Sequence, residues 1–337
     1  NHPETQSSAS SLIVAHIENG QILEIFDVMK RMVEEGLTSM PADWSGLLDL
    51  LEKNAGLALL ARQMAPAEAI YQNVLAIREK TVGFAHPSTL RIVESLASIA
   101  QAKGDWMSAE QFRRRLVAAL DGSVGKNHPD TLRAINELVK MLENKGDYDA
   151  AEAEYRKALA GAVEDYVILG NYAFLLQNIR NDIEGAQKLY RRALAADPMD
   201  AINHANYASL CLLGNELAEA RTHLHEAFSL AKDKPDGFMA RTLYLRAALA
   251  GLEGEDGRSF LGQFKMLLQS NIRPVPSRNI SVRECLRQRL PPDRIALFDA
   301  LYKVLNLDPD GIAMLNACPE WQKTMPILLA ASWPAET

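Results

Sequence analysis

Residues 77–90 read IREKTVGFAHPSTL, and the chain repeats the second half of this stretch at a fixed distance. The pattern is typical of the end of one helix, a short connection and the start of the next, since proline is favoured in a first helical turn, where its missing N–H costs nothing. HPSTL at His86 returns 42 residues later as HPDTL at His128, and the chain opens with HPET at His2, two such steps before His86. We therefore expect a joint between helix pairs to recur along the chain.

Other landmarks keep the same 42-residue step. They are the Ala-Glu pairs at Ala67, Ala109 and Ala151, the KGDW and KGDY sequences at Lys103 and Lys145, and Tyr71 and Tyr155, which are two steps apart. The frame from about 44 to 85 has Trp44-Ser45 in place of His-Pro but keeps the rest. After about residue 165 the step shortens, because GNYAFLL at Gly170 returns 35 residues later as ANYASLC at Ala205.

Each frame predicts two helices. From Leu132 to Leu142 apolar residues recur every three or four positions, which is the spacing of one helix face. Gly146 is expected to end this helix in the left-handed conformation, and the alanines near Ala151 mark a second helix packed closely on the first. A single helix pair cannot bury its apolar face, whereas stacked pairs can. The fold class we predict is therefore all-α: a right-handed superhelix of helix pairs with an extended concave surface.

The joint and the repeat that follows it resemble a known family. IREKTVGFAHPSTL resembles the inter-repeat joint of kinesin light chain, and HPDTLRAINELVKMLENKGDYDAAEAEYRKALA, from His128, resembles one of that family's tetratricopeptide repeats. The likeness covers residues 2 to about 163. The next segment, to about 232, resembles the ordinary repeat of about 34 residues that many bacterial proteins carry. The resemblance implies a tetratricopeptide-repeat superhelix used for protein interaction, and not a motor subunit, because the coiled-coil heptads of that family are absent from this sequence.

We predict three parts along the chain. They are the 42-residue repeats in 1–163, repeats of ordinary length in 164–234, and a degenerate repeat with a helical C-terminal cap in 235–337. In the third part, helical patterns occur in GFMARTLYLRAALAGL, RSFLGQFKMLLQS, SVRECLRQRL and PDRIALFDALYKVL, and a last short helix is expected in CPEWQKTMPILLAASW. A cap is expected because a repeat array needs a polar outer face at its end.

The resemblance also implies candidate binding residues. In that family, asparagines on the inner helix of each repeat face the groove and hold the backbone of a bound peptide. The matching positions here are Ser11, Ser95, Glu137, Asn171 and Asn206, and four residues before the last four of them stand Arg91, Arg133, Val167 and Ile202. The candidate set for a peptide or partner protein is Arg91, Ser95, Arg133, Glu137, Asn171 and Asn206. The alternative for the two asparagines is that they cap or bridge neighbouring inner helices.

The histidines are predicted to be structural. His86 and His128 recur at the same joint, so they are expected to start helices. His204, His223 and His225 invite a metal site, but residues two apart on a helix point to different faces, and no acidic or cysteine partner completes the set. We therefore predict no metal and no cofactor.

Composition and charge disfavour several classes of protein. The net charge of -7 argues against nucleic-acid binding, and no apolar run is long enough to cross a membrane. Three widely spaced cysteines indicate reduced thiols and a cytoplasmic location.

Charged residues are unevenly distributed along the chain. Arg113–Arg115 and Arg191–Arg192 are expected on the solvated outer face. Residues 271–294 are basic whereas residues 1–43 are acidic. This asymmetry could align an oligomer end to end, match two partner surfaces or arise by chance, so the oligomeric state stays open.

The sequence contains no nucleotide-binding loop, catalytic serine motif, His-Glu-x-x-His sequence or cysteine pair, so we predict that the protein is not an enzyme. The predicted function is a non-catalytic interaction module or scaffold that binds a peptide segment or partner protein in its concave groove. The paired lysines that hold a C-terminal carboxylate in relatives are not reproduced, which favours an internal segment or a folded partner. The alternative is a peptide-sensing regulatory domain of a larger, bacterial multidomain protein, because the chain begins inside a motif.

Overall fold

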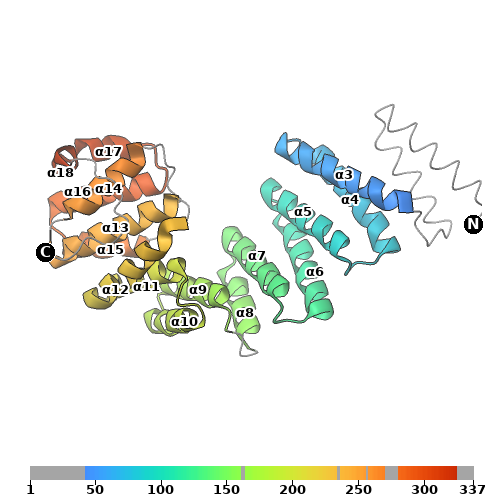
Figure 1. Cartoon of the computed structure of the whole chain (residues 1–337), viewed down its shortest axis with the longest axis horizontal. Coiled ribbons are helices and arrows are strands. Elements are labelled where there is room, and N and C mark those ends of the chain that lie inside the picture. Colours follow the sequence, from blue (N-terminus) through green and yellow to red (C-terminus); the bar gives the residue numbers. More distant parts are fainter. Residues whose placement is uncertain (1–41, 161–163, 234–235, 256, 270–279, 325–337) are drawn as a thin grey trace, which may run out of the picture. The chain divides into compact units, whose positions relative to one another are not determined.

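The computed structural model describes residues 42–160, 164–233, 236–255, 257–269 and 280–324 (Figure 1). Within these ranges the chain forms sixteen α-helices, one π-helical turn and one 3-10 turn, and no strand. The predicted all-α fold is confirmed. The chain divides into two compact units, residues 1–161 (unit 1) and 162–337 (unit 2). The joint at His2 and the candidate Ser11 lie outside the described residues.

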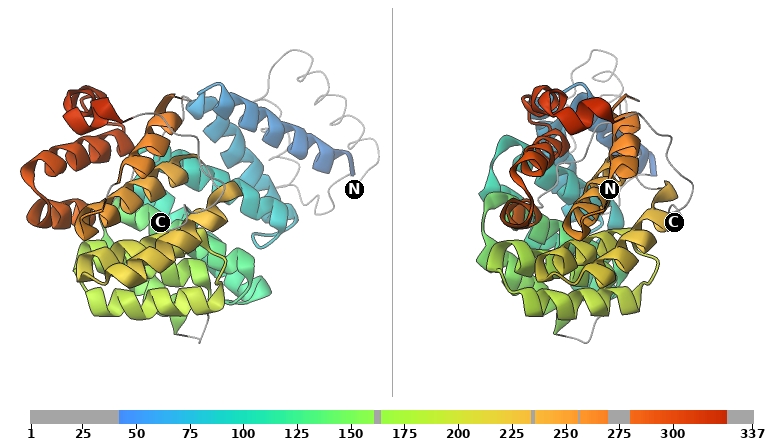
Figure 2. Two further views of the ribbon diagram at one scale, coloured as in Figure 1. Left: turned by 60° about the vertical axis from the view of Figure 1, so that its left-hand side comes forward. Right: turned by 90° about the vertical axis from the view of Figure 1, so that its left-hand side faces the viewer.

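Unit 1 is a stack of helix pairs in chain order (Figures 1 and 2). Its helices are α3 (Ala42–Leu60), α4 (Met64–Thr81), α5 (Pro87–Lys103), α6 (Trp106–Val124), α7 (Pro129–Lys145) and α8 (Tyr148–Leu159). Each helix packs on the next one along the chain. Ala67, Ala109 and Ala151 are completely buried in the second helix of each pair. Their small side chains allow close packing, as the repeat pattern predicted.

The joint between pairs is built twice from the same contacts. Before α5, the His86 ring accepts a hydrogen bond from the Ser88 N–H, and the Thr89 hydroxyl donates to the Gly83 carbonyl at 2.9 Å. Before α7, the corresponding contacts join His128 to Asp130 and Thr131 to Gly125, the latter at 2.8 Å. The histidines are therefore helix caps, as their recurrence predicted.

The turn inside each pair is also repeated. Gly104 and Gly146 follow α5 and α7 with φ of 76° and 85°, a left-handed conformation that residues with a side chain rarely adopt. Asp105 and Asp147 come next and cap α6 and α8, each accepting a hydrogen bond from the backbone N–H three residues on. These two residue types fix where one helix ends and its partner begins.

Unit 2 begins with helix pairs, and its last helices pack back on earlier ones. Its elements are α9 (Tyr166–Leu175), the π-turn η1 (Leu176–Arg180), α10 (Ile183–Ala196), α11 (Ala201–Gly214), α12 (Leu217–Ser229), the 3-10 turn η2 (Leu230–Asp233), α13 (Asp236–Glu253), α14 (Arg258–Gln269), α15 (Ile280–Arg289), α16 (Pro292–Leu305), α17 (Gly311–Ala317) and α18 (Pro319–Lys323). The helices expected in the C-terminal third are present, and α17 is an additional one. None of the described helices is both long and apolar enough to cross a membrane.

The π-turn explains an irregular step in the sequence. Gly170 and Ala205 are 35 residues apart, but the equivalent outer-helix alanines, Ala186 and Ala220, are 34 apart. One extra residue must therefore lie between Gly170 and Ala186, and η1 lies in this interval. A π-turn accommodates one residue more than the same stretch of α-helix. Asn181 then ends the helix with φ 55°, as Asn215 does after α11 with φ 61°.

Within unit 2, the C-terminal helices α15 and α16 fold back onto the earlier helices α11 and α13. α15 packs on α11 and α13, and α16 packs on α13, where the rings of Phe298 and Tyr244 form a T-shaped contact with 5.8 Å between centroids. Ser281 at the start of α15 donates a hydrogen bond to Asn178 in η1. Every residue from Asn203 to Leu212 in α11 is buried. The inner helices of unit 2 are thus enclosed on several sides.

Candidate functional site

The first helices of the pairs in unit 1 keep an exposed polar face. On α5 this face carries Arg91, Glu94 and Ser98, and on α7 it carries Arg133 and Lys140, all of them exposed. The contrast with the enclosed α11 is direct, because α11 has no exposed residue between Asn203 and Leu212. The face of α5 and α7 is therefore one on which a ligand has access to polar side chains of the first helices.

A pocket of about 420 Å³ lies on this face, at the joint between α5 and α7. It is formed by the first turns of α5 and α7 and the end of α6, and its lining is mostly apolar. The apolar part includes Leu90, Leu116, Leu120, Val124 and Ala134, and the charged rim includes Arg91, Glu94, Asp130, Arg133 and Glu137. We call it the first pocket. Such a combination suits an apolar group whose surroundings offer hydrogen bonds.

Three of the six predicted binding residues meet in the first pocket. Arg91, Arg133 and Glu137 line it, although they come from two helices. Arg91 forms an ion pair with Glu52 of α3 at 3.2 Å, and Arg133 forms one with Asp130 at 3.1 Å. Both arginines are well exposed, so these ion pairs contribute little to the stability of the fold. Each arginine can therefore give up its ion pair to contact a ligand.

The other three predicted residues have different surroundings. The Ser95 hydroxyl donates to the Arg91 carbonyl at 3.0 Å, within its own helix. Asn206 is only 5% exposed, and its carbonyl oxygen accepts a hydrogen bond from Arg241 of α13 at 2.6 Å. Asn206 thus bridges neighbouring inner helices, which was the alternative considered for it. Asn171 is half-buried on α9. A part for these residues in ligand binding stays a prediction.

The expectation that Arg113 lies on a solvated outer face is wrong. Arg114 and Arg115 are exposed and form ion pairs, the latter with Glu79 at 2.9 Å, but the side chain of Arg113 is only 4% exposed. The physical reason is its register. Arg113 lies 42 residues from both Tyr71 and Tyr155, which are buried core residues of α4 and α8. This register was the signal in the sequence that could have placed it.

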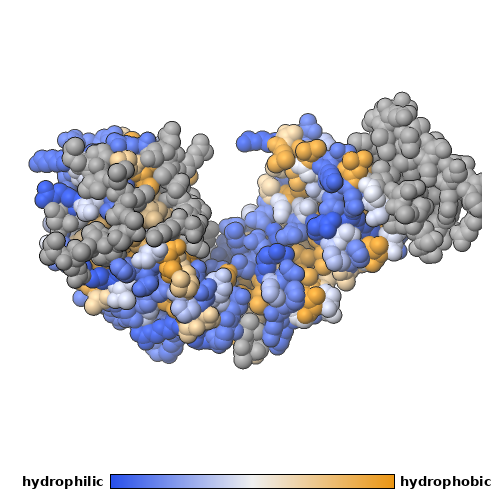
Figure 3. Space-filling model, in the orientation of Figure 1, coloured by the Kyte–Doolittle hydropathy of each residue, from blue (hydrophilic) through white to orange (hydrophobic). Residues whose placement is uncertain are grey.

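A second pocket, of about 450 Å³, lies further along the same face. Its lining includes Ser98 and Gln101 of α5, Arg113 of α6, and Glu137, Lys140 and Asn144 of α7. Glu137 lines both pockets, so the two adjoin. The face of α5 and α7 therefore offers a mostly apolar pocket beside a pocket whose lining mixes polar, charged and apolar side chains. On the side of the molecule drawn in Figure 3, hydrophilic and hydrophobic residues are mixed over the described part of unit 1.

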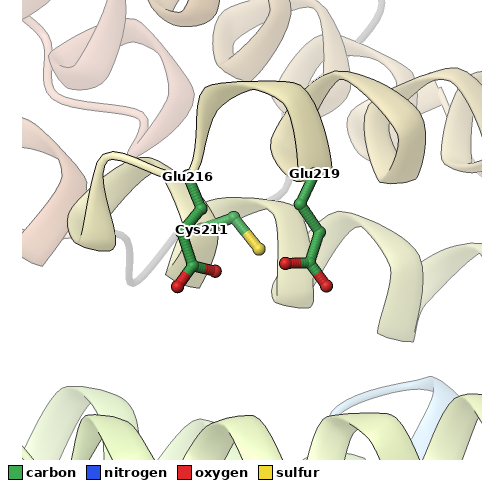
Figure 4. A group of neighbouring side chains, drawn as sticks. All are labelled: Cys211, Glu216 and Glu219. Atoms are coloured by element: carbon green, nitrogen blue, oxygen red, sulfur yellow. The ribbon is translucent and has the colours of Figure 1, made fainter.

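In unit 2, Cys211, Glu216 and Glu219 bring their ligand atoms within 4.8 Å of one another (Figure 4). Glu219 already accepts a hydrogen bond from the Tyr207 hydroxyl at 2.8 Å and pairs with Arg191. Burial raises the pKa of the Cys211 thiol, which keeps it protonated, whereas a metal would need the thiolate. Hydrogen bonding within the α11–α12 pair accounts for this group, and we assign no metal to it.

Two of the three histidines that were considered for a metal site touch each other. His204 and His223 lie with their Nδ1 atoms 2.9 Å apart, and the Nε2 atom of His204 is 3.0 Å from the Pro198 carbonyl oxygen. His225 is exposed, so it points away from this pair, as expected from its spacing. Burial lowers the pKa of His223, and the neighbouring ring of His204 lowers it further. The contact is a hydrogen-bonded pair inside the α11–α12 hairpin.

The described part of the basic segment 271–294 has partners inside unit 2. Arg283 and Arg287 of α15 both bind Asp299 of α16, at 2.7 and 2.8 Å. Arg289 donates to the carbonyl oxygens of Leu212 and Leu213 at the end of α11. A cation at this position is favourable, because the last carbonyls of a helix carry partial negative charge. Much of this positive charge thus holds the C-terminal helices in place.

Comparison with known proteins identifies the repeats. Family models of the tetratricopeptide repeat match residues 57–88 and 88–162. No curated protein matches the sequence. Among solved structures, the apo form of the quorum sensor NprR from B. thuringiensis is similar with a TM-score of 0.54 and 13% identity, covering 92% of this chain and 86% of that chain.

Two further similarities are weaker. PilF of Pseudomonas aeruginosa gives a TM-score of 0.48 and 16% identity, over 67% of this chain and 93% of that chain. A putative kinesin light chain of Podosopora anserina with nearly identical repeats gives a TM-score of 0.34 and 19% identity, over 69% of this chain and 99% of that chain. The family models confirm the resemblance to tetratricopeptide repeats that the joint predicted, and the likeness to the quorum sensor supports the fold alone.

Proposed function

Because this chain is a tetratricopeptide-repeat protein, we propose that it works as a non-catalytic interaction module that binds an extended segment of a partner protein along the face of α5 and α7. The observation that carries this proposal is the first pocket, with its apolar floor and charged rim on an otherwise open helix face. An apolar side chain of the partner fills the pocket, and burial of that side chain supplies most of the affinity.

The rim gives the segment its orientation. Arg91 and Arg133 come from consecutive inner helices, so their guanidinium groups offer donors at two points along the segment. Glu94 and Asp130 offer acceptors on the same rim. A peptide backbone carries both donors and acceptors, and a rim of both kinds can bind it without reading every side chain. The ion pairs of Arg91 and Arg133 are exposed, so exchanging them for ligand contacts costs little.

The first pocket provides a direct test. Val124 lines it and is 46% exposed, so Val124→Asp places a charge in the apolar pocket without disturbing the core. Val82 is the matched control, because it occupies the same register 42 residues earlier, is also 46% exposed, and does not line this pocket. Peptides selected by the purified protein from a displayed dodecapeptide library should share an apolar residue, and Val124→Asp should abolish their binding while Val82→Asp should not. Equal binding by both variants would refute the proposed site.

The second candidate function is a peptide-sensing regulatory domain of a larger protein of bacterial type. The observation that favours it is the fold-level similarity to the quorum sensor NprR over most of this chain. A sensor must change shape when its ligand binds, whereas a scaffold need not. Small-angle scattering of the protein with and without a selected peptide separates the two, because compaction on binding is expected only for the sensor.

We also propose a cytoplasmic location. All three cysteines are free thiols in the structure, two of them buried. Thiols persist in a reducing compartment, and an oxidising one would favour their pairing or modification. Fractionation of the source cell, followed by detection of the protein with an antibody, checks this location.

A further inference from the structure

Arg113 of unit 1 is buried and stands where the neighbouring repeats have tyrosine. Tyr71, Arg113 and Tyr155 follow one another at the 42-residue step, in α4, α6 and α8. Both tyrosines are almost completely buried, and the Tyr155 hydroxyl donates to Glu143 at 3.3 Å. The repeat thus places a large, nearly apolar side chain with one polar tip at this position. In the middle repeat the same position carries a positive charge.

The guanidinium of Arg113 is poorly satisfied inside the protein. Its Nη2 atom is 3.4 Å from the Ser98 hydroxyl and 3.8 Å from the nearest Glu137 oxygen, which is longer than a good charged hydrogen bond. Its Nε and Nη1 atoms are buried and have no hydrogen-bond partner. Buried polar groups are nearly always hydrogen-bonded, so a guanidinium left in this state needs an explanation. Arg113 lines the second pocket, where a ligand can approach it.

The second pocket has the chemistry of an anion site. Besides Arg113, its lining includes the ammonium of Lys140 and the side-chain amides of Gln101 and Asn144, all of which carry N–H donors. The apolar side chains of Trp106 and Met141 complete the wall. Glu137 supplies the negative charge among its lining residues, and it sits at the boundary with the first pocket. A carboxylate placed here would accept hydrogen bonds from Arg113 with the ideal charge pairing.

We propose that the second pocket is a carboxylate subsite, in which Arg113 binds an acidic side chain of the segment whose apolar side chain fills the first pocket. This inference rests on the proposed function and adds the chemical class of the ligand. Glu137 holds the place of that carboxylate in the free protein, at a distance that makes it easy to displace. The segment recognised is therefore one with an apolar residue and an acidic residue a few positions apart.

The role of Glu137 makes the proposal sharp, because its removal should improve binding. Glu137→Gln takes away the competing carboxylate and leaves a neutral side chain of the same size. Affinity for an acidic peptide should rise several-fold, whereas affinity for the same peptide with glutamine in place of the acidic residue should not. If Glu137 were itself a binding residue for the segment, both affinities would fall.

The matched variant for Arg113 comes from the chain's own repeats. Arg113→Tyr installs the residue found at Tyr71 and Tyr155, so the core position keeps a side chain that this fold accommodates. If Arg113→Tyr has a lower melting temperature than the parent, Arg113→Met takes its place, because methionine has a long side chain without charge. Each variant is first compared with the parent by thermal melting, and only a variant that melts with the parent is used for binding.

The probes are displayed dodecapeptide libraries, one with a blocked and one with a free C-terminus. The parent should enrich peptides with aspartate or glutamate at a fixed spacing from an apolar residue, from the blocked library as well as the free one. Replacing that acid by its amide should weaken binding to the parent on the order of 10-fold. The Arg113 variant should bind the acid and the amide equally and still prefer the apolar residue.

The outcomes separate this inference from the proposed function. If the parent and the Arg113 variant show the same preference for the acid, the carboxylate subsite is refuted while the first pocket stands. If acids are enriched only from the library with a free C-terminus, the ligand is a terminal carboxylate and the side-chain assignment is wrong. If neither protein enriches any peptide, the proposed function fails as well.

Discussion

The methyl group of Ala151 is completely buried. Ala151 is 0% exposed near the start of α8, and Ala67 and Ala109 occupy the same place in α4 and α6 with the same burial. Because α8 packs on α7, a larger side chain at this point must push the two helices apart or leave its preferred rotamer. The fixed distance between paired helices thus depends on single residues of minimal size.

Ala151→Leu should therefore destabilise unit 1. Overpacking of a dense core costs about 1–3 kcal/mol. Ala153→Leu, on the exposed side of the same helix, is the control and should leave the midpoint of urea unfolding nearly unchanged. The measurement is urea unfolding followed by circular dichroism. Equal midpoints for the two variants would mean that Ala151 does not face α7.

The His204–His223 pair predicts a dependence of stability on pH. Burial first, and the adjacent His204 ring second, place the pKa of His223 in the folded protein below its usual value of 6.5. Protonation therefore favours the unfolded state, and stability is lost as the pH falls from about 6.5 toward the folded pKa.

Thermal melting at about pH 7.5 and about pH 5.5 tests this, on either side of the ordinary histidine pKa. The drop in melting temperature should be smaller for His223→Gln than for the parent, because glutamine does not titrate. His225→Gln, on the exposed side of the same helix, should show the full drop of the parent. A drop of the same size in all three proteins would show that His223 does not account for the loss of stability.

At the level of helices, glycine has opposite effects in two neighbouring repeats. Gly146 ends α7 with φ 85°, where a side chain is strained. Gly122 lies inside the exposed end of α6, with open space around it. Gly146→Ala should destabilise the protein by about 1 kcal/mol, and Gly122→Ala should stabilise it by about 0.4–1 kcal/mol. Urea unfolding of both variants checks the signs, and a gain of stability at residue 146 would contradict the left-handed cap.

Local features of this kind could be predicted from the sequence, because a cap or turn depends on residues within a few positions of one another. The joint before α7 is an example, since His128 binds a group only two residues away. The extra residue in η1 changed the repeat step from 34 to 35, but only backbone geometry reveals a π-turn. Arg113 was misplaced because it was interpreted within a run of three arginines and not in its 42-residue register.

Contacts between segments that are distant in the chain could not be predicted from the sequence in this way. Ser281 reaches Asn178 across 103 residues, and no repeat connects their positions. A helical cap was expected at the end of the array, but nothing in the sequence indicated that α15 and α16 would lie against α11 and α13. Asn206 accepts a hydrogen bond from Arg241 of α13 and is buried, whereas its counterparts Ser95 and Glu137 in unit 1 keep some exposure.

At the scale of unit 2, the returning helices are expected to be essential for stability. Phe298 of α16 is 4% exposed and packs edge-on against Tyr244 of α13. Phe298→Ala should cost about 3–5 kcal/mol, the usual range for a buried phenylalanine. Ile312→Ala, on an exposed site of α17, should change stability by less than about 0.5 kcal/mol.

Both variants are measured by thermal melting and by binding to a peptide selected on the first pocket. Binding should persist in Phe298→Ala at temperatures where it remains folded, because the pocket lies entirely in unit 1. A small loss of stability in Phe298→Ala would indicate that α16 contributes little to holding α13 in place.

Because the same joint precedes α5 and α7, each 42-residue block is a repeat unit that can be duplicated. The hydrogen bonds that both joints share lie between a glycine and the threonine six positions later, so a block cut just after one glycine can form them again after another. A second copy of residues 84–125 inserted after Gly125 would find a glycine carbonyl for its threonine, as the original copy does. In a gene, one duplication with both ends at glycine codons would lengthen the array by one hairpin. The ligand-binding face would then grow in discrete steps, and copy number would act as a ruler for the length of segment that the protein can hold.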